Sequence, residues 1–238
     1  MGISGGPDMI QDGLVLSLDA SDLNSYVSGS ATWRDLSGNA YNGTLTNGPT
    51  YSIANGGNII FDGSNDYVAF TYTSNIAFLG TSSYTLEIFA VPQSSSFTYP
   101  GFINRESNAG SGRDGYNILH TQDSRPAGQV FIATERWATG SGVQCGFIAT
   151  TGSFYNNWHH IVSTYDSTNI SIYYDGVLKT TTVSTGNITN TTKALEIANR
   201  NGNYYSGSIP IVRVYNRALS ATEVQQNYNA LKSRFGLK

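Results

Sequence analysis

Cysteine is nearly absent from this sequence, which contains Cys145 alone among 238 residues. A single cysteine cannot form a disulfide within the chain, and it cannot supply the several thiolates of a structural zinc cluster. Free cysteine is usually a small buried residue. We therefore expect Cys145 to pack in or near the core, and no histidine or aspartate beside it marks it as a nucleophile.

Charged residues are also scarce, at 12% of the chain, and their balance is slightly acidic. The formal net charge is −3 and the isoelectric point is near 5.5. Proteins that bind nucleic acid through its phosphates normally carry a basic patch. The 13 lysines and arginines are instead scattered along this chain, so we expect no nucleic-acid partner.

Long apolar runs are missing as well. No stretch reaches the roughly 18 apolar residues of a membrane span, so we expect no membrane partner. The first residues, MGISGGPDMIQDG, lack the basic start and apolar core of a secretory signal peptide. Residues 1–12 form a polar arm that we expect to be extended and to become ordered against a neighbouring molecule.

The sequence is rich in strands with a two-residue period, and the clearest pair lies between Trp158 and Gly176. Ile170, Ile172 and Tyr174 fall on one face of the second strand, which is typical of a sheet with one buried face. Turn-forming residues fill 166–169 between the two strands. His159 and His160 are consecutive on the first strand, so we expect them on opposite faces, one at the core margin and the other in solvent.

Other strand-like segments follow one another at the short spacing of a β-sandwich. They are residues 13–21, 58–70 (a hairpin around Asp62-Gly63), 84–92, 101–106, 115–121, 128–135, 143–151, 177–183, 193–200 and 208–216. No helices alternate with them, so the pattern predicts one all-β domain over residues 13–238.

One short helix is predicted near the C-terminus. Ser220 and Glu223 have the spacing of a capping box, and Gly236 can end the helix. Val224, Tyr228, Leu231 and Phe235 recur at helical spacing on one face, which we expect to pack on the sandwich.

Eight sequence segments, taken together and in this order, are typical of one family, and they cover most of residues 13–235. They are GLVLSLDASD, TWRDLSGNAYNGTLTNGP, NIIFDGSNDYV, SYTLEIFAVP, WHHIVSTYD, ISIYYDGVL, LEIANR and YYSGSIPIVRVYNRALSATEV. Together they resemble the laminin G-like branch of the concanavalin A-like lectin/glucanase superfamily. The resemblance implies a jelly-roll sandwich of two antiparallel sheets. The amino-acid sequence most resembles laminin G-like virion proteins of tailed bacteriophages, notably in the segment YNRALSATEVQQNYNALKSRFGL.

Glycoside hydrolysis needs two carboxyl groups roughly 5–10 Å apart across the sugar bond. The related glucanases supply them from one strand, in patterns such as Glu-x-Asp-x-x-Glu. Here the corresponding strand offers Glu87 alone, and the other glutamates lie in unrelated segments. No Gly-x-Ser-x-Gly elbow is present for a serine hydrolase. We expect a protein without enzymatic activity.

Calcium is the candidate cofactor, because relatives often bind it on the sandwich. Asp62 and Asp66 flank a Gly-Ser-Asn turn and are the candidate ligands. The alternative is that both aspartates only make turn hydrogen bonds, since one pair supplies fewer oxygens than calcium requires.

Carbohydrate binding needs an exposed aromatic platform beside planar polar groups. Three expected loops offer them, at residues 104–115, 134–142 and 199–207. The candidate residues are Trp137, Arg136, Tyr204, Tyr205, Asn203, Arg105 and Asp114. The alternative is that Trp137 folds back on the sandwich rim and the tyrosines cover a sheet edge.

The resemblance implies a non-enzymatic virion structural or decoration protein, on capsid or tail, assembled in the host cytoplasm. We expect several copies on the particle surface, docked to other virion proteins through residues 1–12, with loops that contact glycans on a cell surface. The alternative is a free-standing carbohydrate-binding or adhesion module of bacterial origin.

Overall fold

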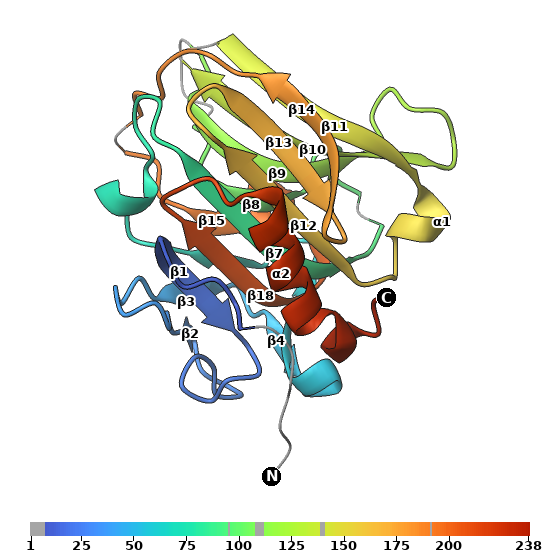
Figure 1. Ribbon diagram of the computed structural model, residues 1–238. Helices are drawn as coiled ribbons and strands as arrows, with labels where there is room; N and C mark the ends of the chain where they lie inside the picture. Colours follow the sequence, from blue (N-terminus) through green and yellow to red (C-terminus); the bar gives the residue numbers. More distant parts are fainter. Residues whose placement is uncertain (1–7, 95, 108–111, 139–140, 191) are drawn as a thin grey trace.

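The computed structural model describes residues 8–94, 96–107, 112–138, 141–190 and 192–238. Two eight-stranded antiparallel sheets stack face to face as a jelly-roll sandwich, with a helix across one outer face (Figure 1). The expected fold class is confirmed.

Sheet A carries the helix. In spatial order its strands are β14 (Val177–Val183), β13 (Asn169–Tyr174), β12 (His159–Tyr165), β7 (Tyr84–Pro92), β18 (Ser206–Tyr215), β5 (Asn58–Asp62) and β4 (Thr50–Ser52), with β1 (Leu14–Asp19) also paired to β18.

Sheet B forms the other layer. In spatial order its strands are β11 (Ser141–Thr150), β10 (Gln129–Ala138), β9 (Gly115–Thr121), β8 (Gly101–Asn104), β15 (Glu196–Ile197), β6 (Tyr67–Ala69), β3 (Gly43–Thr46) and β2 (Thr32–Trp33). A separate two-stranded ribbon joins β16 (Asn199–Arg200) to β17 (Asn203–Tyr204).

Short helical turns join some of these strands. They are η1 (Ala54–Gly56), η2 (Ser74–Ile76) and the one-turn α1 (Thr151–Phe154), and the chain ends with α2 (Ala221–Leu231) and η3 (Lys232–Phe235). No helix in the described ranges is long and apolar enough to cross a membrane.

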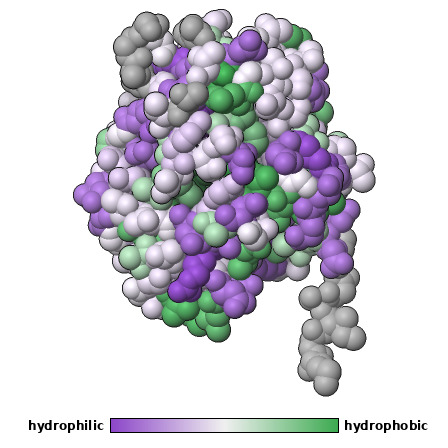
Figure 2. Space-filling model, turned by 90° about the vertical axis from the view of Figure 1, so that its left-hand side faces the viewer, coloured by the Kyte–Doolittle hydropathy of each residue, from purple (hydrophilic) through white to green (hydrophobic). Residues whose placement is uncertain are grey.

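The core lies between the two sheets and is filled by alternate residues of the central strands. Leu86 and Ile88 of β7 and Ile161 of β12 are fully buried there. Cys145 belongs to the same core at 1% exposure, as expected, and burial raises the pKa of its thiol. Figure 2 shows one side of the molecule, where hydrophobic residues form separate patches among hydrophilic ones.

The strand pair at residues 158–176 is confirmed as the hairpin of β12 and β13, with Tyr165 opposite Ile170. Asp166 closes its turn, because its Oδ1 accepts hydrogen bonds from the backbone amides of Thr168 and Asn169 at 2.9 and 2.6 Å. At the other end Asp175 and Gly176 take positive φ values of 51° and 76°, as a tight turn into β14 requires.

The expected hairpin around Asp62-Gly63 is wrong. β5 pairs with β4 and β18 in sheet A, whereas β6 pairs with β3 and β15 in sheet B. Residues 63–66 therefore carry the chain from one sheet to the other. The turn residues at 63–66 are compatible with a hairpin and with a crossover between the sheets. The crossover forms because β5 and β6 each pair with strands distant in sequence.

The C-terminal helix has the expected capping box. The Glu223 amide donates to Ser220 Oγ at 3.3 Å, and the Ser220 amide donates to Glu223 Oε2 at 2.8 Å. Val224 and Tyr228 face the sandwich and are buried. Gly236 ends the helical segment with a φ of 66°.

Helix α2 lies across the outer face of sheet A (Figure 1). Beneath it is a buried polar network. Glu87 is fully buried and accepts hydrogen bonds from His160 Nε2 at 2.8 Å and Asn227 Nδ2 at 2.9 Å. Its Oε1 also lies 3.6 Å from Arg213 Nη1. Burial favours a higher pKa for Glu87, but Arg213 and His160 outweigh it and hold the pKa below its usual value.

The two histidines do lie on opposite faces of β12, but neither faces solvent. His159 stacks on Tyr174 at the core side, with ring centroids 4.6 Å apart. His160 lies under α2, stacked on Phe89 at 4.4 Å. The exposure expected for one histidine is wrong because α2 covers the outer face of sheet A.

Residues 8–12, the described part of the N-terminal arm, lie against the domain itself. The Ile10 amide donates to Asn227 Oδ1 at 2.9 Å, and Asp12 pairs with Arg217 at 2.8 Å. Gln226 Nε2 donates to the Asp8 carbonyl at 2.6 Å. This part of the arm is thus ordered by α2 of the same chain.

Candidate carbohydrate-binding face

The direction in which each side chain of β10 points determines which of the predicted site residues on this strand can contact a ligand. The expected loop at 134–142 is largely strand, since β10 continues to Ala138 and β11 begins at Ser141. Side chains of a strand alternate between faces. Thr134 bonds to Ser163 of sheet A at 2.7 Å and Arg136 lies 4.2 Å from the centre of the Tyr165 ring, so both point into the sandwich.

Arg136 is 1% exposed and is committed to the fold. Its Nη2 donates to the carbonyls of Gly80 and Gly186 at 2.7 and 2.9 Å. The expectation that Arg136 lies in an open loop is wrong. Strand β10 continues past Arg136 to Ala138, and its alternation directs the Arg136 side chain into the sandwich. Trp137, the next residue, faces outward from sheet B.

Trp137 is half-buried on the outer face of sheet B. Its Nε1 donates to Glu135 Oε2 at 3.1 Å, and the Arg113 guanidinium lies 4.7 Å from the ring centre. Gly142, its cross-strand partner, leaves room for the ring: a Cβ there would come within 2.3 Å of it. The indole is therefore held in one position before any ligand arrives.

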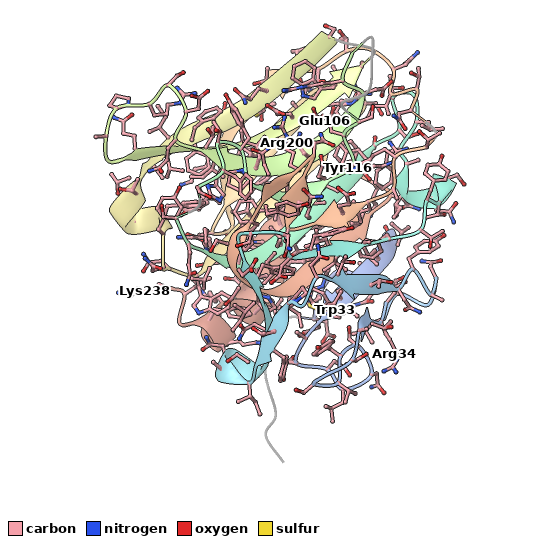
Figure 3. All side chains as sticks on the ribbon, turned by 180° about the vertical axis from the view of Figure 1, so that it is seen from behind. Trp33, Arg34, Glu106, Tyr116, Arg200 and Lys238 are labelled. Carbon is pink, nitrogen blue, oxygen red and sulfur yellow. The ribbon has the colours of Figure 1, made fainter. Side chains whose placement is uncertain are left out.

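Beside Trp137 lies a pair of buried carboxylates that the sequence alone did not associate. Glu106 follows β8 and Glu135 lies on β10, with β9 between them. Arg200 Nη2 lies 3.0 Å from Glu106 Oε2 and 2.8 Å from Glu135 Oε2. Asn117 Nδ2 donates to the same two oxygens at 2.6 and 3.0 Å. Figure 3 shows Arg200 and Glu106 close together on this face.

The two glutamates thus do not occupy unrelated positions. Glu106 is fully buried, and burial raises its pKa while Arg200 opposes the shift. Gln144 Nε2 donates to Glu135 Oε1 at 2.9 Å, and Arg113 Nε lies 3.2 Å from Glu106 Oε1. Each carboxylate is held by several donors, so the network fixes Arg200 and Trp137 rigidly.

The turn at 199–207 divides its two tyrosines between core and surface. Tyr205 is fully buried and packs against Phe102 at 5.0 Å, so its ring belongs to the core. Tyr204 is half-buried, with Phe97 at 5.5 Å between ring centroids. Asn203 Oδ1 accepts from the Tyr99 amide at 3.4 Å.

Tyr99 connects this turn to the carboxylate network. The Arg200 guanidinium lies 5.6 Å from the centre of the Tyr99 ring. Contacts therefore run without a break from Trp137 through Glu135, Arg200 and Tyr99 to the ribbon of β16 and β17. We call this the Arg200 surface, defined by Tyr99, Arg113, Glu135, Trp137, Arg200, Asn203 and Tyr204. Arg200 and Glu135 are each 4% exposed and lie beneath it, whereas the other five side chains are at least partly exposed.

Arg105 and Asp114, the remaining sugar-binding candidates, have structural partners. Arg105 is 1% exposed and its Nη2 donates to the Asn190 carbonyl at 2.6 Å. Asp114 is 7% exposed and accepts from the Thr189 amide and hydroxyl at 3.0 and 2.6 Å. Both side chains fasten the segment before β15 to the sandwich, away from the outer face.

Asp62 and Asp66 lie in a turn in which one oxygen of each carboxylate accepts a hydrogen bond from a backbone amide. Asp62 Oδ1 accepts from the Ser64 amide at 2.8 Å, and Asp66 Oδ2 accepts from the Asp62 amide at 3.2 Å. Calcium requires six to eight oxygen ligands. Within the described ranges, no group of three or more His, Cys, Asp or Glu residues is placed to hold a metal ion. This donor set does not fit a calcium site.

The family model described as "Concanavalin A-like lectin/glucanases superfamily", in its Laminin_G_3 form, matches residues 62–225. The chain belongs to this superfamily. No curated protein matches its sequence.

Solved binding domains of a mosquitocidal protein and of botulinum neurotoxins have a similar fold. The binding domain of Paraclostridial Mosquitocidal Protein 1 superposes with a TM-score of 0.71 at 20% identity, over 95% of this chain and 56% of that one. A botulinum neurotoxin DC binding domain in complex with SialylT gives 0.69 at 17% identity, over 93% and 52%. A botulinum neurotoxin D domain in complex with N-acetylneuraminic acid gives 0.68 at 14%, over 92% and 51%. The chain spans about half the length of these proteins, and the likeness concerns the fold.

Proposed function

We propose that this lectin-fold protein binds glycans through the Arg200 surface and does not hydrolyse them. The observation that carries the proposal is the unbroken line of contacts that joins the Trp137 ring to Arg200 and the Asn203 turn on one outer face. Sugar rings stack their apolar faces on aromatic side chains and bond their hydroxyls to planar polar groups. The Arg200 surface offers the Trp137 ring for stacking and the Arg113 and Asn203 side chains for hydrogen bonds. The buried Arg200 links Glu135 to Tyr99 beneath them.

Fixed positions favour affinity, because binding then orders few side chains. Glu135 holds the Trp137 indole by a hydrogen bond, and Gly142 provides the space in which the ring lies. Arg113 stacks over the indole with its side chain 37% exposed, so its guanidinium can also meet a ligand. A bound sugar would thus stack on the Trp137 ring and accept hydrogen bonds from the adjacent Arg113 guanidinium.

The carboxylate pair supports binding without hydrolysis. Two glutamates this close could in principle act as acid and nucleophile. Glu106, however, is fully buried, and Arg200 and Asn117 occupy the oxygens that face between the two carboxylates. Incubation with β-glucans should release no reducing sugar, and release that Glu135→Gln abolishes would overturn this part of the proposal.

The toxin neighbours support glycans as the ligand class. Two of them were solved with SialylT or N-acetylneuraminic acid, as their descriptions state. Their identity to this chain is 17% or less, so the parallel extends to the class of ligand and not to individual residues.

We also propose that the protein is displayed in several copies on the surface of a tailed-phage particle, on capsid or tail. The resemblance of several successive sequence segments to phage laminin G-like proteins supports this placement. Residues 1–7, beyond the part of the arm that α2 holds, would contact other virion proteins. Mass spectrometry of purified particles should detect the polypeptide. Its absence would favour the alternative, a free-standing bacterial adhesion module.

Glycan-array binding followed by calorimetry tests the Arg200 surface. Trp137→Ala should weaken binding of the best oligosaccharide at least about tenfold, as expected for a buried aromatic contact. Tyr51→Ala, a half-buried aromatic of β4 in the other sheet, is the matched control and should leave affinity unchanged. If no glycan binds at millimolar concentration, or if the two variants behave alike, the proposal fails.

A further inference from the structure

A small polar pocket opens beyond Tyr99, at the C-terminal end of β9. Its volume is about 300 Å³, and its walls include Phe97, Pro100, His120, Thr121, Asp123 and Tyr155. This is the lower end of the size range of small-molecule sites, roughly 300–1,000 Å³. None of these residues was among the sugar-binding candidates in the sequence.

The pocket touches the Arg200 surface at two points. The Tyr99 hydroxyl donates to Asp123 Oδ2, and the Phe97 ring meets Tyr204 edge-on at 5.5 Å. Trp137 lies opposite Gly115 at the other end of β9, whereas Phe131 lies opposite Thr121 beside the pocket. Six residues of strand separate the two ends, or about 20 Å.

The walls combine apolar faces with hydroxyl and carboxylate groups. Phe97 and Tyr155 supply aromatic surface, and Thr121 and Asp123 supply oxygens. Thr121 Oγ1 already accepts from the Asp123 amide at 2.9 Å, which fixes the turn that carries the carboxylate. An exposed carboxylate on a fixed turn is a strong acceptor for sugar hydroxyls.

The charge of the pocket is negative. His120 is buried, and burial lowers its pKa to about 3, so the imidazole is neutral at neutral pH. Burial raises the pKa of Tyr155 to about 12, so the phenol is neutral as well. Asp123 is the one charged group among the described residues that line the pocket. Arg125, two residues on, stacks over Phe131 at 4.4 Å.

We propose that this pocket binds one uncharged sugar ring, a neutral or N-acetylated pyranose, with Asp123 accepting its hydroxyls and Phe97 against its apolar face. The assignment rests on the proposed glycan-binding function and names its terminal subsite. A sugar carboxylate would meet the carboxylate of Asp123, and like charges in contact select against a partner. The pocket therefore discriminates against the acidic sugars that two of the fold neighbours were solved with.

Ligand-observed NMR with free monosaccharides tests this assignment. The probes are glucose, galactose, mannose and N-acetylglucosamine on one side, and glucuronic acid and N-acetylneuraminic acid on the other. At least one neutral probe should bind with a millimolar Kd, and neither acid should bind. Asp123→Asn should weaken the neutral probe about tenfold, the effect of losing a hydrogen bond to a charged group. Asp22→Asn, a half-buried turn aspartate elsewhere, should change nothing.

The outcomes separate the pocket from the rest of the surface. If no neutral monosaccharide binds, if an acid binds as well, or if Asp123→Asn has no effect, the pocket assignment is wrong. Oligosaccharide binding that Trp137→Ala still weakens would then leave the proposed function standing. Conversely, Trp137→Ala should leave monosaccharide affinity unchanged. If the pocket binds sugar but Trp137→Ala does not affect oligosaccharide binding, the glycan-binding role proposed for the Arg200 surface is wrong and the role proposed for the pocket stands.

Discussion

Each sheet carries a buried charged network on its outer face, and the two networks differ in what covers them. On sheet A, Glu87 and Arg213 lie under α2, and both are at most 1% exposed. On sheet B, Arg200 of β16 reaches Glu106 and Glu135, and the partly exposed side chain of Arg113 pairs with Glu106. The first network borders only protein, whereas the second borders the half-exposed Trp137 ring.

The difference indicates separate roles for similar chemistry. A buried ion pair stabilises little against its own desolvation, but it specifies geometry and is costly to break. In sheet A that geometry fastens α2 and residues 8–12 to the sandwich. In sheet B it positions the Trp137 ring and the Arg113 guanidinium at the surface, where a ligand can meet them, while Arg200 itself stays buried at 4% exposure.

The largest expected effect comes from Glu87→Ala. It leaves Arg213 buried without its carboxylate and removes the acceptor of Asn227, so the free energy of unfolding should fall by about 3–5 kcal/mol. Chemical denaturation measures the loss. Glycan affinity of the folded fraction should not change.

Two results would contradict this contrast between the networks. One is a loss of about 1 kcal/mol or less, the size expected of an exposed pair. The other is weakened glycan binding by protein that remains folded. Glu87→Gln, which keeps the shape of the side chain, serves as the milder comparison.

Gly142→Ala should act on the other network alone. A methyl group at this position collides with the Trp137 ring, so the indole must move, and glycan affinity should fall about tenfold, or about 1.4 kcal/mol. Gly152→Ala is the control, because a methyl group there meets no neighbour within 4 Å. Equal affinities of the two variants in calorimetry would show that the position of Trp137 does not matter.

The smallest effect is a difference in pH dependence. The pKa of Glu87 is lowered in the folded state, so its contribution to stability is present above the unfolded value of about 4.3 and declines as pH falls through the folded value. The pKa of Glu106 is raised, so its contribution is full below about 4.3 and is lost as pH rises through the folded value.

Unfolding curves of the wild type and of Glu87→Gln and Glu106→Gln, taken from neutral pH down to about 3, check these opposite signs. The stability advantage of the wild type over Glu87→Gln should shrink on acidification. The advantage over Glu106→Gln should grow. Parallel changes for the two variants would mean that the networks do not differ electrostatically.

Features that depend on near neighbours in sequence were predictable. The hairpin at 158–176 follows from its alternation and turn residues, and the helix follows from Ser220 and Glu223 three positions apart. The cysteine follows from the burial habit of its residue type. In each case the partners that stabilise the feature are a few residues away or belong to the common core.

Features that depend on distant pairing were not predictable. Arg200 meets Glu106 and Glu135 only because β16 lies beside β8, and because the end of β8, β9 and β10 bring Glu106, Asn117 and Glu135 side by side. The direction of Arg136 follows from how far β10 continues. Of the candidate sugar-binding residues, Trp137, Asn203 and Tyr204 reach the Arg200 surface, while the others point into the protein.

The docking of residues 8–12 on α2 has a practical consequence for how the domain is held. The C-terminal residue lies on the same helix, since Tyr228 Oη donates to the Lys238 carbonyl at 2.7 Å. Both described ends of the chain are thus on the sheet A side, and the Arg200 surface is on the sheet B side. Anchored by either end to a sensor chip, a resin or a larger assembly, the domain would turn the Arg200 surface outward.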